Sequence, residues 1–236
     1  MRLLVIDTET TGINLDRDEV IEVAGILIET DSRSVIASYS SLLHVGSNPG
    51  ERVNGIPQAA LDSPLSVNRC VAMGPFIYLL ENADVVVAHN AEFDRPMTLK
   101  LIEAELAGEI PDDLRKPWVC SMTQLRFPAY PNEFPGRSRR RLAYVAVDHG
   151  IPVPKLHRAM SDAMLLTSIL LEIPDLESQV ERAKWPRDLY VVYPPSPEPR
   201  PTEFGFHWNP DKKRWERLLN KLEAGELPFA AEVVHG

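Results

Sequence analysis

The chain is organised around the stretch Leu3-Leu4-Val5-Ile6-Asp7-Thr8-Glu9-Thr10-Thr11-Gly12. It begins with a continuous apolar run, which is typical of a strand buried on both faces of a sheet. Because side chains alternate along a strand, Asp7 and Glu9 project to the same side, about 7 Å apart along the chain. Gly12 permits both a sharp turn and the close approach of a ligand to the backbone. These residues alone leave two interpretations open, a pair of metal-binding carboxylates or a strand that runs into a polar turn.

The composition is that of a globular protein. The 236 residues are 44% hydrophobic, which is enough for one sizeable domain and an appendage. Because no apolar run reaches roughly 18 residues and no leader precedes the first strand, we expect no membrane span, no secretory signal and a cytoplasmic location. Cys70 and Cys120 lack metal-binding spacing, so we expect reduced, mostly buried thiols. The net charge of -9 argues against a polyanion-binding surface, and an acidic metal site would account for part of this excess.

The order of the predicted elements is that of an α/β protein. The segments 19–28 and 35–43 are expected to form an antiparallel meander with the first strand. The remaining elements expected are strands at 84–89 and 117–122, and helices at 53–62, at 66–82 with a kink at Gly74-Pro75, from His89 to Gly108, from Ser138 to His149, and from His157 to about 170.

Three regions are expected along the chain. Residues 1–175 form the main domain, 176–201 form a proline-rich extended linker, and 202–236 form a small appendage. Within the appendage, 203–208 alternates apolar and polar residues, and 209–212 is a turn signal. The sequence does not decide whether 214–222 is a return strand or a short helix.

Acidic residues also lie in the first turns of two predicted helices. Asp94 follows the strand that ends at His89, and Asp162 follows His157. The helix dipole favours acids there, which is the commoner reason for such residues. If these two acids converge with Asp7 and Glu9, the four carboxylates would suit a pair of Mg²⁺ ions that clamp the oxygens of a phosphodiester. His157 would take the proton from the attacking water, since histidine can act as a base at neutral pH.

These residues resemble the motifs of the DnaQ-like 3′-to-5′ exonucleases of the DEDDh type. The stretch 7–12 is similar to the first motif, 88–94 to the second, and His157-x4-Asp162 to the third, in the expected order. The resemblance covers residues 1 to about 172. The sister subtype carries Tyr four positions before the last Asp, where this chain has Arg158. The resemblance implies a ribonuclease-H-like fold, a mixed five-stranded sheet flanked by helices.

The resemblance also implies a role for each site residue. Two divalent cations, Mg²⁺ or also Mn²⁺, would be bridged by Asp7, with Glu9 and Asp162 completing one site and Asp94 holding the other largely through water. His157 would be the general base, and Glu9 would also accept from the 3′-hydroxyl. Ile13 or Leu15 would wedge against the terminal base. The implied substrate contacts are Thr10, Thr11, Gly12, Ile13, Leu15, Asn90 and Phe93.

Two further clusters have an open interpretation. Arg137, Arg139, Arg140 and Arg141 crowd the start of one predicted helix, and we weigh a solvated basic face against phosphate contact by Arg139 and Arg140. The pattern Gly205-x2-Trp208-Asn209-Pro210-x2-Lys213-x-Trp215 is similar to a small module found beside DNA-processing domains. It would contact nucleic acid or a replication or repair protein, or pack on the main domain. The appendage aromatics Phe204, Phe206, Trp208 and Trp215 are expected to form a small core.

The functional hypothesis is a metal-dependent 3′-to-5′ exonuclease that releases nucleoside 5′-monophosphates from single-stranded or frayed 3′ ends of DNA. DNA is favoured because 118–122 and the helix after it resemble DNA-directed family members. An exoribonuclease is the alternative, since no residue identifies whether the groove accepts a 2′-hydroxyl. An inactive nucleic-acid-binding scaffold is the third possibility, and the complete set of acids argues against it.

Overall fold

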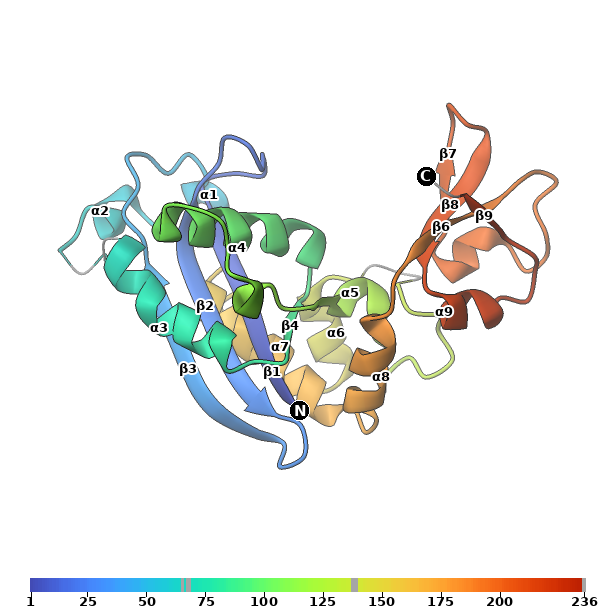
Figure 1. The fold of residues 1–236 in the computed structure, drawn as a ribbon, viewed down its shortest axis with the longest axis horizontal. Helices are drawn as coiled ribbons and strands as arrows, with labels where there is room; N and C mark the ends of the chain where they lie inside the picture. The colour runs from blue at the N-terminus through green and yellow to red at the C-terminus, as the bar shows by residue number, and fades with distance from the viewer. Residues whose placement is uncertain (65, 67–68, 137–139, 235–236) are drawn as a thin grey trace.

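A mixed five-stranded sheet forms the centre of the main domain (Figure 1). The computed structural model describes residues 1–64, 66, 69–136 and 140–234. The strands lie in the order β3-β2-β1-β4-β5, with β1 antiparallel to β2 and parallel to β4. Their bounds are Arg2–Thr10 for β1, Val20–Glu29 for β2, Ser34–Leu42 for β3, Val85–Ala88 for β4 and Trp118–Cys120 for β5. The expected sheet and its N-terminal meander are confirmed.

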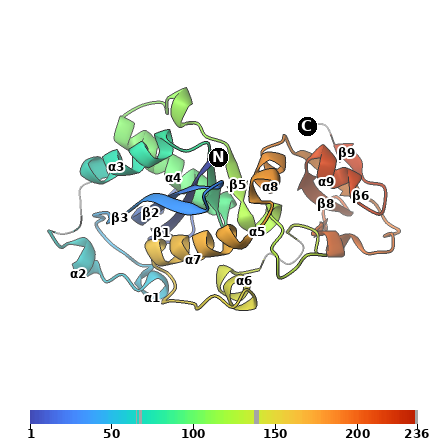
Figure 2. The ribbon, with the colours of Figure 1, turned by 90° about the horizontal axis from the view of Figure 1, so that it is seen from below.

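Helices cover both faces of this sheet (Figure 2). Leu4 and Ile6 of β1 pack in a core shared with α3 (Arg69–Glu81) and α4 (Ala91–Leu106). Leu3 and Val5 pack in the core on the other face, under α7 (Ala159–Glu172). Strand β1 is therefore buried on both faces, as its apolar run predicted. The shorter helices are α1 (Glu51–Asn54), α2 (Gln58–Leu61), η1 (Asp112–Leu114), α5 (Ser121–Gln124) and α6 (Leu142–Asp148).

Two helix starts differ from the sequence expectation. Helix α6 begins at Leu142 with Arg141 as its N-cap, whereas Ser138, the expected cap, lies outside the described residues. Helix α7 begins at Ala159 because His157 has a left-handed φ of 61° and Arg158 is extended, so neither residue is helical. His157 thus lies in the loop before α7 rather than at the start of the helix. Helix α3 carries Pro75 in its interior, as expected.

The segment 176–201 is not the extended linker that the prolines suggested. Helix α8 (Leu176–Ala183) occupies its first part, and Leu176, Val180 and Ala183 are buried in the core under α7. Their i, i+4, i+7 spacing is that of a helix with one apolar face. The prolines that follow led instead to the prediction of an extended linker. Strand β6 (Asp188–Val192) follows and is an interior strand of a second sheet.

This second sheet is antiparallel and four-stranded, in the order β7-β8-β6-β9. The undecided segment 214–222 contains strand β8 (Arg214–Leu219), and α9 (Lys221–Gly225) begins near its end. The other elements are η2 (Pro201–Phe204), β7 (His207–Asn209) and β9 (Glu232–Val234). Phe206 is buried in the small core of this sheet and Phe204 and Trp215 pack against it, whereas Trp208 is 40% exposed.

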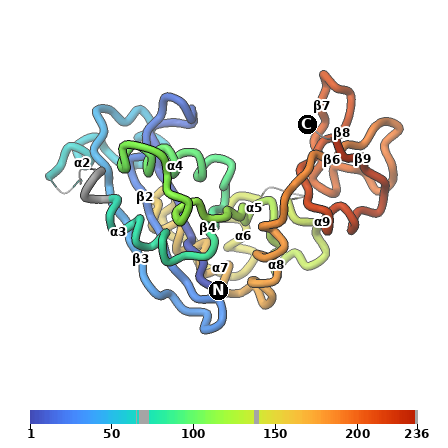
Figure 3. The backbone as a smooth tube through the Cα atoms, viewed as in Figure 1, coloured from blue at the N-terminus to red at the C-terminus, as the bar shows by residue number. Residues whose placement is uncertain are grey.

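Specific side-chain contacts fasten the second sheet to the main domain. Arg217 of β8 donates to the carbonyl oxygens of Thr123 and Pro135, and its guanidinium lies 4.9 Å from the ring centroid of Phe134. Asn220 Nδ2 donates to the carbonyl of Arg182 in α8 at 2.9 Å. Figure 3 shows the chain passing from α8 into this sheet. Among the helices of the described chain, none has the length and apolarity needed to cross a membrane.

Candidate active site

The carboxyl end of β1 leaves the sheet at the motif that the sequence singled out. Glu9 pairs with Glu22 of β2, but the register shifts after it, so that Thr10 pairs with Val20. Such irregularities redirect side chains and end strand pairing. Asp7 and Glu9 lie on the face of β1 that Leu3 and Val5 share, which is the face toward α7. The predicted pairing of the two acids on one face is therefore observed.

Four carboxylates converge where β1, α4 and α7 meet. Glu9 and Asp94 are buried, and Asp7 and Asp162 are partly exposed. Burial raises the pKa of Asp7 well above its ordinary value, and the charges of Asp94, Asp162 and Glu9 raise it further. Burial likewise raises the pKa of Glu9 from 4.5 to about 8, with contributions from Asp162 and Asp94. The structure thus brings the four predicted acids close enough for their charges to act on one another.

Asp94 is held in place by Thr8. Helix α4 begins directly after β4, with Asn90 as its N-cap, which puts Asp94 in the first turn. Thr8 Oγ1 donates to Asp94 Oδ1 at 2.9 Å. Burial raises the pKa of Asp94 to about 6, and the hydrogen bond from Thr8 opposes this rise. The sequence analysis assigned no role to Thr8, although its position between two acids, on the opposite face of β1, was the available signal.

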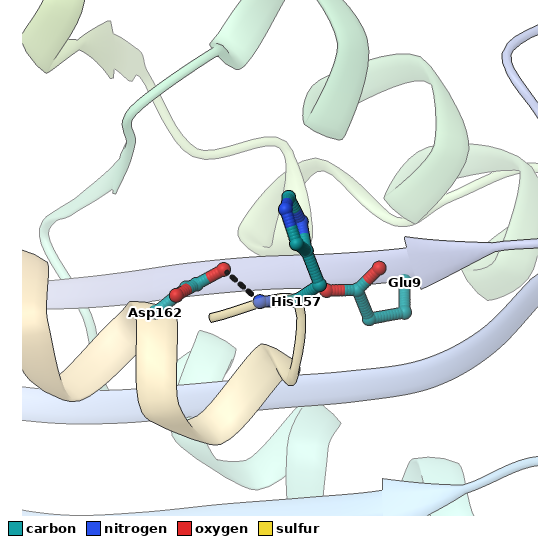
Figure 4. A group of neighbouring side chains, drawn as sticks. All are labelled: Glu9, His157 and Asp162. Carbon is teal, nitrogen blue, oxygen red and sulfur yellow. Dashed lines mark hydrogen bonds between the residues drawn. The ribbon is translucent and has the colours of Figure 1, made fainter. Parts of the chain in front are cut away.

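Glu9, His157 and Asp162 form the tightest group of potential metal ligands. One ligand atom from each lies within 4.8 Å of the other two. Figure 4 shows that they come from β1, from the loop before α7 and from α7 itself. The backbone N of His157 donates to Asp162 Oδ2 at 3.1 Å, as the dashed line marks. Within the described residues, this mutual spacing does not extend to Asp7 or Asp94.

The donor set fits divalent cations. Asp162 Oδ1 is buried, and no hydrogen-bond partner for it is found among the described residues. The raised pKa values of Asp7 and Glu9 mean that their negative charges are poorly compensated by the protein. A bound cation would supply the missing positive charge, and carboxylate oxygens suit Mg²⁺ and Mn²⁺. Glu9 and Asp162 would hold such an ion, with Asp7 and Asp94 beside them.

A fifth carboxylate, Glu22, lies beside the cluster and was not predicted. It is the cross-strand neighbour of Glu9 and is 2% exposed. Arg158 Nη2 and Nε donate to it at 2.8 and 3.0 Å, and the backbone N of Ala159 donates at 2.9 Å. The signal in the sequence was an acid in the middle of an apolar strand, with an arginine directly after His157.

Hydrogen bonds fix the loop after β1, which carries Ile13 and Leu15, the residues predicted to pack against the terminal base. Thr11 Oγ1 and the backbone N of Asn14 donate to the two oxygens of Asp18, at 2.9 and 2.7 Å. Lys100 of α4 donates to three carbonyl oxygens of the same loop, at 3.0 to 3.2 Å. Ile13 is 90% exposed and Leu15 is 40% exposed. A fixed loop with exposed apolar side chains beside the acids is suited to contact a base.

The remaining predicted substrate contacts have mixed surroundings. Asn90 is exposed at the start of α4, and Phe93 is partly buried against the core of that helix. Arg140 pairs with Glu133 at 2.6 Å and lies 3.9 Å over the ring of Tyr130. Arg140 is therefore not part of a solvated basic face, and its contact with phosphate stays a prediction. Arg139 lies outside the described residues.

Comparison with known proteins identifies the family. The family model described as Exonuclease (RNase_T) matches residues 4–170, and the chain therefore belongs to this exonuclease family. The family resemblance predicted from the three motifs is confirmed. A second model, a domain of unknown function (DUF8626), matches residues 202–234.

Similar proteins include two DNA polymerase III epsilon subunits. DNA polymerase III subunit epsilon of Treponema pallidum (strain Nichols) is 30% identical over 66% of this chain and 69% of its own length. The subunit of the same name in Aquifex aeolicus (strain VF5) is 27% identical over 72% and 79%.

Solved structures share the fold. E. coli exonuclease I in complex with a dT13 oligonucleotide aligns with a TM-score of 0.60 and 14% identity, over 81% of this chain. This chain spans only 48% of that exonuclease. The nuclease domain of 3′hExo, a DEDDh family member bound to rAMP, aligns with a TM-score of 0.57 and 15% identity, over 75% and 92% of the two chains.

Proposed function

We propose that this protein is a divalent-metal-dependent 3′-to-5′ exonuclease that acts on DNA. The observation that carries the proposal is the group of Glu9, His157 and Asp162, whose ligand atoms lie within 4.8 Å of one another beside Asp7 and Asp94. Membership of the exonuclease family and likeness to polymerase III epsilon subunits support it. The substrate is a single-stranded or frayed 3′ end, and the product is a nucleoside 5′-monophosphate.

The residues divide the work of hydrolysis. Asp7, Glu9, Asp94 and Asp162 would hold the cations, Mg²⁺ or Mn²⁺, and bound cations would neutralise charge on the phosphodiester. His157 takes a proton from the attacking water, whose oxygen bonds to the terminal phosphorus. The bond from phosphorus to the 3′ oxygen of the penultimate nucleotide breaks, and that oxygen takes up a proton. Ile13 or Leu15 packs on the terminal base and keeps the phosphodiester in register with the acids.

An exoribonuclease is the alternative function. A solved nuclease domain of the same fold holds rAMP, and a ribonuclease T of Histophilus somni (strain 129Pt) is 27% identical over 42% of this chain. DNA stays the first candidate because the more extensive sequence matches are to polymerase III epsilon subunits. An inactive scaffold is disfavoured because all four acids are present and converge.

The wider context of the enzyme is part of the same proposal. The exonuclease domain covers residues 1–175 together with α8, which packs in its core, and the C-terminal sheet is a surface for nucleic acid or for a replication or repair protein. The ring centroids of Trp208 and Trp215 lie 5.3 Å apart, and Trp208 is exposed. An exposed aromatic pair of this kind supports such a contact. We infer a cytoplasmic location from the likeness to DNA polymerase III epsilon subunits.

A side-by-side time course tests the function. Matched DNA and RNA oligonucleotides, each with a free or a blocked 3′ end, are incubated with the full chain and Mg²⁺ or Mn²⁺. We expect mononucleotides from free DNA 3′ ends, slower release from RNA, and none with a chelator. Faster RNA cleavage would establish the ribonuclease alternative. Binding of intact strands without any cleavage would instead support the inactive scaffold.

A further inference from the structure

Glu22 is a buried acid in a place where another negative charge is unfavourable. It lies across from Glu9 in the sheet, and its charge raises the pKa values of Asp7, Glu9 and Asp162. A carboxylate that is 2% exposed needs a compensating partner, because removing a lone charge from water is costly. Glu22 therefore requires an explanation separate from that of the four metal-binding acids.

Within the described residues, the hydrogen bonds found for the Glu22 carboxylate come from the two residues that follow His157. Arg158 Nη2 donates to Oε1 at 2.8 Å, while Arg158 Nε and the backbone N of Ala159 donate to Oε2 at 3.0 and 2.9 Å. Both carboxylate oxygens are thus engaged, and a paired guanidinium holds the fork geometry in place. Glu22 has no free oxygen for a cation, which separates it from Asp162 and its unpartnered buried Oδ1.

These contacts fix the loop that carries His157. His157 has a φ of 61°, a region that residues with a side chain seldom adopt and that the surroundings must hold. On the α7 side, Asp162 accepts from the backbone N of His157. On the sheet side, Glu22 binds the Arg158 side chain and the backbone N of Ala159. That N–H lies at the start of α7, where the N-cap residue supplies no side-chain hydrogen bond.

We propose that Glu22 and Arg158 are positioning residues, which hold the His157 side chain beside Glu9 and Asp162 for proton transfer from water. This inference rests on the proposed function, in which His157 is the base. The pair spans β2 and the start of α7, so it ties the base to the same sheet that carries Asp7 and Glu9. A small displacement of a catalytic group lowers the rate by about a hundredfold in unfavourable cases, which sets the scale of the effect.

A double-mutant cycle on the full chain separates this role from a purely structural one. Glu22→Gln, His157→Ala and the double variant are compared on a 3′-labelled DNA oligonucleotide, with kcat and KM measured separately. Glu29→Gln, near the end of the same strand, is the matched control. Thermal unfolding and Mn²⁺ affinity are measured for each variant. Arg158→Lys, which keeps the charge but loses the fork, and Arg158→Ala provide a second route, since the Arg158 side chain is 42% exposed.

We expect Glu22→Gln to lower kcat about tenfold or more with little change in KM or Mn²⁺ affinity, and to have less than about a twofold effect when His157 is already Ala. Arg158→Lys should retain more activity than Arg158→Ala. An equal loss in both backgrounds would overturn the inference, because Glu22 would then act independently of the base. Unchanged kcat in Glu22→Gln, or in Arg158→Ala if Glu22→Gln does not fold, would also overturn it. Full activity of His157→Ala would instead refute the base assigned in the proposed function.

Discussion

At the scale of single residues, the site is a set of similar carboxylates with different surroundings. Asp94 receives a hydrogen bond from Thr8, which favours its charged form, whereas burial and the neighbouring charges dominate at Asp7. Glu9 is buried beside Glu22 and Asp162, and its pKa rises to about 8. Without cations, part of this cluster stays protonated at neutral pH. The same acids become full ligands once cations supply positive charge.

Replacement of Asp7 tests the metal assignment directly. Asp7→Asn keeps the shape of the side chain but removes a negative charge that would help to hold the cations. We expect kcat to fall by at least about a hundredfold, because charge stabilisation by a bound metal is worth several kcal/mol. Initial rates on a 3′-labelled oligonucleotide and Mn²⁺ calorimetry measure the two effects. Asp31→Asn, in an exposed turn, is the control. Wild-type activity in Asp7→Asn would remove Asp7 from the metal site.

The raised pKa of Glu9 predicts how the stability of the metal-free protein depends on pH. The folded state keeps a proton on Glu9 up to about pH 8, whereas the unfolded chain releases it near the ordinary value of 4.5. The free energy of unfolding therefore falls as pH rises through this window. We expect the melting temperature in chelator to decrease from about pH 5 to about pH 8, and added Mn²⁺ to restore it most at the upper end. A weaker slope in Glu9→Gln checks the assignment, and an equal slope would contradict it.

At the scale of elements, the geometry depends on how each strand or helix ends. Strand β1 shifts register after Glu9, α4 starts directly after β4, and α7 starts after a left-handed residue. Each of these strand or helix ends brings an acid, or His157, to the same site. The loop from Gly12 to Asp18 is then fixed to α4 by Lys100. The site is therefore formed at the ends of strands and helices rather than in their middle.

Gly12 tests the loop after β1. A Cβ at this position would lie 2.5 Å from Asp18 Oδ2, and Thr11 and Asn14 hold that carboxylate in place. We expect Gly12→Ala to displace the loop that carries Ile13, to cost about 1–3 kcal/mol of stability, and to raise KM more than it lowers kcat. Gly46→Ala, where a Cβ would meet no atom within 4 Å, is the control. Equal KM values for the two variants would mean that the loop does not contact substrate.

The limits of sequence prediction are also clearest for elements. The apolar runs before Asp7 and His89 predicted buried strands, and short-range spacing then predicted where the acids would lie. The contacts of Thr8 and Glu22 were not predicted, because they depend on strand register and on residues 86 and 136 positions away. Proline content outweighed the apolar spacing of Leu176, Val180 and Ala183, so α8 was expected to be linker. Local pattern is visible in one sequence, whereas register and long-range pairing are not.

At the scale of the whole molecule, two sheets are joined by polar contacts and by Phe134 of the main domain, which is buried in the core of the C-terminal sheet. The buried Arg217 is central among them, because its guanidinium binds backbone carbonyls of Thr123 and Pro135 in the main domain and of Phe204 in its own sheet. The ion pair between Arg126 and Glu226 lies at the surface and contributes less. The joint is therefore specific in geometry.

Arg217→Met should loosen this joint. The change leaves buried carbonyl oxygens without donors, and we expect it to lower the free energy of unfolding by about 2–4 kcal/mol. The C-terminal sheet should become sensitive to protease while the main domain stays protected. Limited proteolysis followed by mass measurement of the fragments checks this, with the exposed Lys221→Gln as control. Protection equal to that of the unchanged protein would mean that other contacts hold the sheets together.

Strand β3 forms the outer edge of the five-stranded sheet, and one row of its backbone N–H and C=O groups therefore faces away from β2. Ala37 and Tyr39 pack inward, while the exposed Ser38 and Ser40 alternate with them. An exposed edge strand can pair with the same strand of a second copy of the chain, and polar side chains along the strand weaken that tendency. Valine at both serine positions would turn 35–40 into an apolar, strongly β-forming segment. We therefore expect the two serines to lower the tendency of β3 to pair with a second copy of the chain at high concentration.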